Sequence, residues 1–472
     1  MGICNQMMLV TYADSLGKNL KELDRIAKKH LEGVVGGIHI LPFYPSSADR
    51  GFAPLCYDRV DEAFGDYGDV RHLAERYYLM FDFMVNHISR QSEFFRDFVE
   101  KKDNSRYKDF FICYKDFWEN GMPSGEQLSM IYKRKPRAPY TEVAFNDGTV
   151  EKVWCTFGEE QIDLNVSAPA TKQFIRESLT SLCGNGASVI RLDAFAYAVK
   201  KAGTNCFFAE PDIWDLLYEI DAIANENNAL ILPEIHTHYS VKLKLAERGF
   251  WTYDFALPII VLNALYSGSG SYLKDWLLMS PKHQFTVLDT HDGIGVLDGA
   301  ELIPEEELEW TKNKMFSEGA NVKKVFNGTA YGNMDVYQVN TTYYSALGNC
   351  DDTYLLARAI QFFAPGIPQI YYVGLLAGKN DLELLEKTRE GRSINRHYYT
   401  EEETDREFTR PVVQKLISLM RFRNMHPAFH IDGELEAELP APYIIVIRRR
   451  HGAAYAVLTA DLMKKTFEIK HS

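Results

Sequence analysis

The chain has 472 residues, of which 46% are hydrophobic and 25% charged, a composition typical of a large globular enzyme. Its formal net charge of −13 argues against nucleic acid or an anionic membrane as a partner. The seven cysteines are scattered without a C-x-x-C pair, so we expect reduced thiols, a cytoplasmic location and no zinc site. The pattern of apolar residues also leads us to expect neither a signal peptide nor a transmembrane segment.

Short apolar runs alternate with segments of helical period along most of the chain, as is typical of a parallel α/β fold. We expect strands at residues 7–12, 37–41, 79–85, 187–194, 229–235, 251–255, 285–288 and 367–373. We expect helices at residues 19–30, 70–77, 171–183, 213–225, 353–363 and 411–423. Eight strands, each followed by a helix or an insertion, are the count of a (β/α)8 TIM barrel.

Two insertions and a late change of pattern divide the expected barrel. The stretch 89–167, after the third strand, is rich in Lys, aromatic and Pro residues and predicts an inserted lobe. The stretch 293–340, after the seventh strand, predicts a second insertion that is polar and irregular from residue 294 onward. The barrel parts are then 1–88, 168–292 and 341–425, and short alternating apolar runs predict a small β domain at 426–472.

The stretch 187–194, ASVIRLDA, places two charges at the end of a buried strand. An unpaired carboxylate there would be costly, so we expect Arg191 to hold Asp193 ionised through a charge-assisted contact. Taken alone, the stretch is also compatible with an ordinary structural ion pair.

Polar residues end other predicted strands too. Asn86 and His87 follow the third strand, Glu234 ends the fifth, and His291 and Asp292 follow the seventh. In a barrel these strand ends meet at one face, so the side chains should converge. Converging carboxylates suit glycosyl transfer, in which one attacks or stabilises the anomeric carbon and another protonates the leaving oxygen. Because no cation adjoins Glu234 in the sequence, we expect its pKa to be raised and its role to be that of the acid.

The motifs AFGDYGD, FMVNH, IRLDA, ILPEIH and TVLDTHD resemble the strand-end motifs of glycoside hydrolase family 13, the α-amylase family. The longer strings RGFAP, YDFALP, LDTHDGIGV, TTYYSALG, PQIYYVGLLAGKND and GRSINRHYY resemble the sucrose phosphorylases within that family, and the similarity covers nearly the whole chain. The resemblance implies that Asp193 is the nucleophile, Glu234 the general acid/base and Asp292 the transition-state stabiliser.

The resemblance also implies a set of substrate-binding residues. Glucosyl hydroxyls would be bound by Asp49, His87, His291 and Arg392, and Arg191 would steady the nucleophile. The rest of the set comprises the aromatic residues Phe52, Phe157 and Tyr197, His236 of the ILPEIH motif, and Asp335, Tyr337 and Gln338 of a loop that contacts fructose or phosphate. Neither a zinc spacing nor an acidic calcium loop occurs, so we expect no metal and no cofactor.

A basic loop interrupts the acidic chain. Lys133, Arg134, Lys135 and Arg137 crowd the string IYKRKPRAPY of the expected lobe. The loop could simply be solvated, but the resemblance favours a phosphate-attracting role. Arg137 is the expected phosphate ligand, since Arg binds phosphate through a planar fork.

The resemblance therefore implies a retaining phosphorylase, a glucosyltransferase that converts sucrose and phosphate to α-D-glucose 1-phosphate and fructose through a β-glucosyl-enzyme. Sucrose 6'-phosphate remains an alternative substrate, although family members of that type tend to carry His where this chain has Tyr337. Relatives that use glycerol or glycerate as acceptor are further alternatives. A non-catalytic amylase-like domain is a remote one, because such domains lose the catalytic carboxylates. The expected partners are thus small molecules, and the sequence leaves the oligomeric state open.

Overall fold

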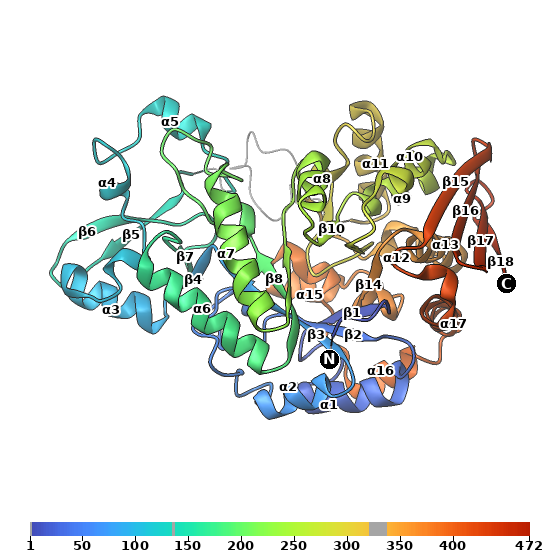
Figure 1. Cartoon of the computed structure of the whole chain (residues 1–472), viewed down its shortest axis with the longest axis horizontal. Helices are drawn as coiled ribbons and strands as arrows, with labels where there is room; N and C mark the ends of the chain where they lie inside the picture. The colour runs from blue at the N-terminus through green and yellow to red at the C-terminus, as the bar shows by residue number, and fades with distance from the viewer. Residues whose placement is uncertain (1, 135–136, 321–337) are drawn as a thin grey trace. The chain divides into compact units, whose positions relative to one another are not determined.

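The computed structural model describes residues 2–134, 137–320 and 338–472 (Figure 1). By its internal contacts the chain divides into two compact units. Of the described residues, unit 1 comprises Gly2, 40–134 and 137–235, and unit 2 comprises 3–39, 236–320 and 338–472. None of the helices in these ranges combines the length and the apolar character that crossing a membrane requires.

The parallel strands of unit 1 are β3 (Tyr78–Met84), β8 (Ala187–Asp193) and β9 (Leu230–Pro233), adjacent in that order. Every residue of β3 is buried, and β8 is buried as far as Leu192, as is typical of parallel strands covered on both faces. The associated helices are α2 (Tyr67–Ala74), α6 (Pro169–Gly184) and α7 (Asp212–Glu226).

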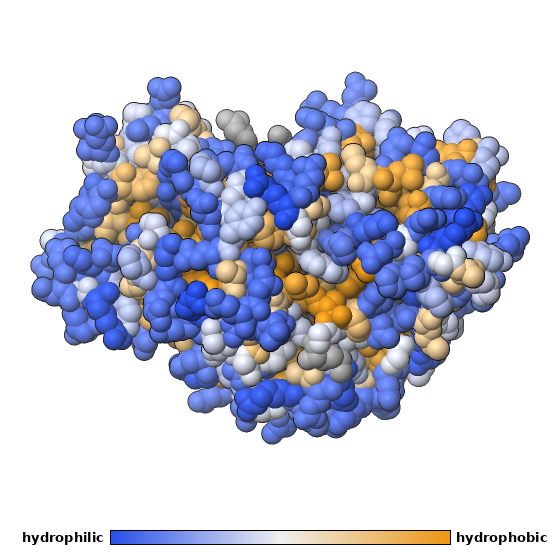
Figure 2. Space-filling view, in the orientation of Figure 1, coloured by the Kyte–Doolittle hydropathy of each residue, from blue (hydrophilic) through white to orange (hydrophobic). Residues whose placement is uncertain are grey.

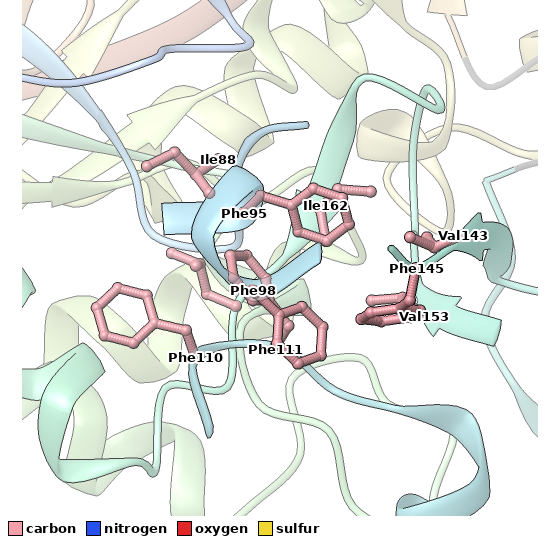
Figure 3. Packing of buried hydrophobic residues seen from close by; sticks show 10 residues of the cluster. Ile88, Phe95, Phe98, Phe110, Phe111, Val143, Phe145, Val153 and Ile162 are labelled. Carbon is pink, nitrogen blue, oxygen red and sulfur yellow. The ribbon is translucent and has the colours of Figure 1, made fainter. Parts of the chain in front are cut away.

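Residues 87–163 of unit 1 form small elements of their own. They are β4 (His87–Ser89), α3 (Glu93–Lys101), α4 (Tyr114–Phe117), α5 (Gly125–Met130), β5 (Tyr140–Ala144), β6 (Val150–Trp154) and β7 (Gln161–Asp163). Ten buried apolar residues of this part of the chain, from Ile88 to Leu164, gather into one core (Figure 3). In it the ring of Phe111 packs edge-on against Phe95 and stacks on Phe98. A second cluster of this region contains Tyr114, Trp118, Ile131 and Trp154. These two cores give the region a fixed shape although it lacks a regular βα repeat among the described residues.

In unit 2 the strands β10 (Thr252–Asp254), β11 (Gln284–Thr286), β14 (Ile367–Tyr371), β1 (Met8–Thr11) and β2 (Gly37–Ile40) follow one another in the sheet in that order. Its larger helices are α1 (Leu20–Ile26), α8 (Tyr239–Glu247), α9 (Leu257–Ser267), α10 (Ser271–Met279), α11 (Glu305–Ser317), α13 (Asp351–Phe363), α15 (Leu382–Thr388), α16 (Glu401–Glu407) and α17 (Pro411–Met425). Short elements are β12 (Ile294–Gly295), β13 (Gln338–Val339), α12 (Tyr343–Ala346) and α14 (Tyr372–Leu375).

The C-terminal part of unit 2 is an antiparallel sheet, red in Figure 1. Its strands β15 (Glu434–Ala441), β16 (Ile444–His451), β17 (Ala454–Asp461) and β18 (Thr466–His471) pair in sequence order. Alternate residues of β17 are buried, which matches the alternating apolar pattern that predicts this sheet. On the face of the molecule shown in Figure 2, hydrophilic residues predominate, as expected for a chain with this charge.

The expected strands and helices are confirmed, but the expectation that residues 294–340 are irregular is wrong for part of that stretch. Residues 305–317 form α11, whose first turn carries Glu305, Glu306 and Glu307 and is therefore stabilised by the helix dipole. Its polar composition concealed the helical period. The apolar helix α9 was missed for the opposite reason, since a helix that is buried on all sides shows no amphipathic period. The division of the chain into six parts stays a prediction.

Candidate active site

The carboxylate of Asp193 ends β8 and is held by the guanidinium of Arg191. Arg191 Nη1 donates a hydrogen bond of 2.9 Å to Asp193 Oδ1, as the sequence predicts, and another to Asp82 of β3. The strand register brings the three together, because Asp82 pairs with Arg191 across β3 and β8. The Arg191 side chain is 4% exposed and Asp82 is fully buried, so the contact is desolvated and orients the Asp193 carboxylate firmly.

Glu234 follows β9 directly and lies against the same arginine. Its Oε2 accepts a hydrogen bond of 3.0 Å from the N–H of Ala194, whose φ of 52° is uncommon for alanine and turns that N–H toward the carboxylate. Arg191 Nη2 lies 3.7 Å from Glu234 Oε1. A cation that the sequence around Glu234 lacks is therefore supplied in space, because Arg191 reaches it from the neighbouring strand, and the raised pKa expected for Glu234 stays a prediction.

His87 is buried at the start of β4. Its Nε2 lies 2.9 Å from the carbonyl oxygen of Phe52 and 3.2 Å from Nε2 of Gln161. Burial lowers the pKa of His87, although the charges of Asp163 and Asp49 oppose this effect. The imidazole is thus neutral near pH 7.

Aromatic rings surround this group in unit 1. The Phe157 ring lies 5.6 Å from that of His87 and 5.2 Å from that of Tyr197. The Arg191 guanidinium lies 5.9 Å from the centre of the Phe52 ring. The three aromatic residues that the resemblance implies therefore adjoin the polar residues that it implies, as in many sugar-binding sites, where rings cover the apolar face of a pyranose.

A tight turn in unit 1 presents Asp49 and Phe52. Asp49, Arg50 and Gly51 have positive φ angles of 48°, 50° and 108°. A Cβ atom at position 51 would lie 2.5 Å from the carbonyl oxygen of Pro42, so only glycine fits there. Gly51 of the RGFAP string is thus a structural requirement of this turn.

In unit 2, Asp292 is surrounded by basic side chains. Its Oδ1 lies 3.1 Å from Arg392 Nη2 and 3.9 Å from Arg396 Nη2, and its Oδ2 lies 3.6 Å from His291 Nε2. Asn395 donates a hydrogen bond of 2.8 Å to the Asp292 carbonyl oxygen and so fixes the loop. The predicted residues His291, Asp292 and Arg392 are therefore brought together within unit 2.

His236 and Gln338 form another part of the predicted set in unit 2. His236 Nδ1 lies 3.0 Å from Oδ2 of the buried Asp298, and His236 Nε2 lies 3.4 Å from Gln338 Nε2. The imidazole stacks on Phe255 with ring centres 3.9 Å apart. His236 and Asp292 line one small pocket of this unit.

The basic loop of unit 1 lines a small pocket together with Tyr197. Lys133, Arg134 and Arg137 all contribute to its wall. The Arg134 guanidinium lies 5.6 Å from the centre of the Tyr197 ring. Arg137 Nη2 lies 2.7 Å from Glu159 Oε1, and both side chains are exposed, by 45% and 60%. A cationic pocket therefore adjoins an aromatic residue of the predicted sugar site.

Three residues named in the sequence analysis, Lys135, Asp335 and Tyr337, lie outside the described residues. Sequence reasoning also missed partners that the structure shows, namely Asp82 beside Arg191 and Asp298 beside His236. Asp82 could have been found from the sequence, because it is a lone charge inside the apolar run YLMFDFM of β3 and such a charge needs a buried partner. No sequence pattern points to Asp298, because only the fold brings it to His236.

Comparison with known proteins gives a consistent result. A model of the alpha-amylase catalytic domain matches residues 12–247. The chain is 54% identical over 471 residues to a sucrose phosphorylase of Streptococcus mutans, covering 99% of this chain and 98% of that protein. It is 41% identical over 469 residues to a glucosylglycerol phosphorylase of Marinobacter adhaerens, covering 99% and 97%. The crystal structure of a sucrose 6F-phosphate phosphorylase from Thermoanaerobacter thermosaccharolyticum matches with a TM-score of 0.95 and 42% identity, covering 100% of this chain and 96% of that one.

Proposed function

Since this chain belongs to the α-amylase family, as an enzyme related over its whole length to glucosyl-transferring phosphorylases, we propose that its substrates are sucrose and inorganic phosphate. The (β/α)8 fold with a C-terminal β domain, expected from the sequence, is confirmed by the same relationship. The products would be α-D-glucose 1-phosphate and fructose. The observation that carries the proposal is the relationship over 99% of the chain to a sucrose phosphorylase.

In the first half of the proposed reaction, the Asp193 carboxylate attacks the anomeric carbon of sucrose and Glu234 protonates the fructosyl oxygen. The Arg191 contact supports the first role, because it orients the Asp193 carboxylate and favours its ionised form. Arg191 also neutralises part of the charge that Asp82, Asp193 and Glu234 bring together. We assign transition-state stabilisation to Asp292, whose contacts with Arg392 hold its carboxylate in place.

In the second half, phosphate attacks the same face of the β-glucosyl-enzyme, so that the α configuration is retained. A dianion that approaches carboxylates is repelled by about 4 kcal/mol for each pair of unit charges about 4 Å apart at an effective dielectric constant of about 20. Cations must offset this repulsion. The pocket lined by Lys133, Arg134 and Arg137 supplies them, and we propose Arg137 as a phosphate ligand.

A second candidate donor is sucrose 6'-phosphate. It is favoured by the close structural match to a phosphorylase named for that substrate and by the same basic pocket, which could hold a phosphoryl group on the fructosyl side. Residue Tyr337, which favours unphosphorylated sucrose in the sequence analysis, lies outside the described residues.

A donor panel separates the candidates. The purified enzyme is incubated with phosphate and, in parallel, with sucrose, sucrose 6'-phosphate or glucosylglycerol, and glucose 1-phosphate is measured. We expect kcat/KM to be at least tenfold higher for sucrose than for the other donors. A preference for sucrose 6'-phosphate or glucosylglycerol would replace the proposed donor, and release of glucose 1-phosphate from none of the three would refute the proposal.

A further inference from the structure

A buried lysine that the proposed mechanism does not use lies beside His87 in unit 1. The Lys200 side chain is 2% exposed. Its ammonium contacts three oxygen atoms, at 2.6 Å from Asp163 Oδ2, 2.5 Å from Asn86 Oδ1 and 2.6 Å from the carbonyl oxygen of Tyr197. These oxygens belong to three separate segments, so a single cation joins the end of β3, the strand β7 and the loop after β8. All three donor protons of the ammonium are used.

Asp163 is the carboxylate that pairs with Lys200, and its other contacts hold it in place. It lies directly opposite His87 in the antiparallel pair of β4 and β7. Its Oδ1 accepts a hydrogen bond of 2.7 Å from the N–H of Thr156, and its Oδ2 accepts one of 2.6 Å from the Thr156 hydroxyl. Because Asp163 is fully buried, its charge requires a cation, and Lys200 supplies it.

The contact between Lys200 and Asn86 determines how the Asn86 amide is oriented. An ammonium can only donate, so it must face the amide oxygen, and the Asn86 amino group then points the other way. Asn86 Nδ2 lies 3.3 Å from Nδ1 of His87. Since that amino group can only donate, Nδ1 must accept and carries no proton. The imidazole proton is then on Nε2, which faces the carbonyl oxygen of Phe52, an acceptor only, at 2.9 Å. The Gln161 amino group lies 3.2 Å from the same nitrogen, but it donates to the Phe52 carbonyl oxygen at 2.9 Å and so does not require Nε2 as an acceptor.

We propose that Lys200 is a positioning residue that fixes the Asn86 amide and, through it, the tautomer of His87. The inference rests on the proposed function in one respect, namely that His87 contacts the glucosyl group. Burial is the main cause of the lowered pKa of His87, and the charge of Lys200 adds to it, whereas Asp163, the hydrogen bond to Phe52 and Asp49 raise this pKa. Lys200 thereby holds the imidazole donor at a defined nitrogen and helps to keep the ring neutral.

The ring nitrogens of His87 provide a test that does not depend on activity. The full-length protein is labelled with 15N-histidine, and the His87 signals are identified by their loss in His87→Gln. In the wild type we expect a neutral ring protonated at Nε2. In Lys200→Met, which removes the charge but keeps the length, the ring should lose this fixed tautomer and titrate at a pH about one unit higher, because Asp163 is no longer compensated.

The matched control is Lys201→Met. Lys201 also contacts a carboxylate, that of Asp212 at 2.6 Å, but its side chain is 46% exposed. This variant should leave the tautomer and titration of His87 unchanged. The same tautomer and the same titration in Lys200→Met as in Lys201→Met would overturn the proposal.

A second variant keeps the proposal testable if Lys200→Met does not fold. Asn86→Asp retains an oxygen for the ammonium but removes the amino group, so Nδ1 of His87 should gain a proton. An unchanged Nε2–H tautomer in Asn86→Asp would also overturn the proposal.

Activity gives a separate readout. With the donor that the panel identifies, kcat/KM of folded Lys200→Met should fall at least tenfold, and the acid limb of its pH profile should move to higher pH. A lower melting temperature with an unchanged pH profile would reduce Lys200 to a structural role and contradict the proposal. If the wild type transfers no glucosyl group, the proposed function fails, while the nuclear magnetic resonance result still decides the tautomer.

Discussion

Two arginine–carboxylate pairs of unit 1 have similar lengths and very different surroundings. Arg191 lies 2.9 Å from Asp193, and Arg137 lies 2.7 Å from Glu159. The first arginine side chain is 4% exposed and the second 45% exposed. The two distances are nearly equal, so the pairs differ mainly in how far their side chains are buried.

Burial decides what each pair can do. The desolvated Arg191 is held by carboxylates on neighbouring strands and cannot leave, so it serves as a permanent partner for Asp193. The solvated Arg137 pair is screened by water and salt and contributes little to stability, so an incoming phosphate can replace the Glu159 carboxylate at small cost. The first pair suits the role of nucleophile that we propose for Asp193, and the second suits the role of phosphate ligand that we propose for Arg137.

The largest expected effect comes from breaking the buried pair at Asp193, the proposed nucleophile. Asp193→Asn removes the charge with little change of volume, so the attack on the anomeric carbon should fail. We expect kcat with sucrose to fall by about a thousandfold or more, with an unchanged circular dichroism spectrum. A variant that keeps more than about a tenth of the wild-type rate would exclude Asp193 as the nucleophile.

The next effect concerns Glu234, the proposed acid, which shares Arg191 with Asp193. Glu234→Gln cannot protonate fructose, so turnover of sucrose should fall by about 10²- to 10⁴-fold. The donor α-glucosyl fluoride needs little protonation and should still glucosylate Asp193 at a rate close to that of the wild type. Comparable losses with both donors in a stopped-flow assay would show that Glu234 is not the acid.

A smaller effect is expected at the exposed pair. Arg137→Ala should raise KM for phosphate about tenfold through the loss of a charge-assisted contact, with less effect on glucosylation by neutral sucrose. Water then competes better for the glucosyl-enzyme, so the ratio of free glucose to glucose 1-phosphate should rise at fixed phosphate.

The control for that variant is Arg59→Ala, which removes another exposed arginine, 3.3 Å from Asp58. It should leave the product ratio unchanged. If Arg137→Ala behaves in the same way, Arg137 is only a solvated surface charge.

The smallest effect follows from removing the competitor of phosphate. Glu159→Gln frees the Arg137 guanidinium from an exposed ion pair, so KM for phosphate should fall about two- to fivefold. The adjacent Glu160→Gln, which removes a carboxylate that accepts a hydrogen bond from Gln91, serves as the control. An equal or higher KM in Glu159→Gln, measured at constant ionic strength, would contradict the view that the exposed pair is exchangeable.

The same contrast explains how much the sequence could predict. The pair of Arg191 and Asp193 was predictable, because two charges at the end of a buried strand imply each other. The eight strands were predictable for a similar reason, since parallel strands leave apolar runs in the sequence. The second contact of Arg191, with Glu234, depends on the register of neighbouring strands, and no local pattern encodes it.

Other parts of the site were beyond sequence reasoning for the same physical reason. Lys200 stands in the string AVKKAG, where nothing distinguishes it from the exposed Lys201. Only the fold shows that one ammonium is buried among three oxygens and the other lies in water. The pairing of Arg137 with Glu159 across 22 positions likewise arises from the fold of the loop region, not from any motif.

The most direct test of the central claim follows the fate of the glucosyl group. The wild-type enzyme is mixed with sucrose and phosphate, and 31P nuclear magnetic resonance is recorded while glucose and fructose are measured enzymatically. The account predicts α-D-glucose 1-phosphate and fructose in equal amounts, little free glucose, and a rate that depends on phosphate. Release of glucose and fructose in equal amounts at a rate independent of phosphate, or formation of the β-phosphate, would contradict it.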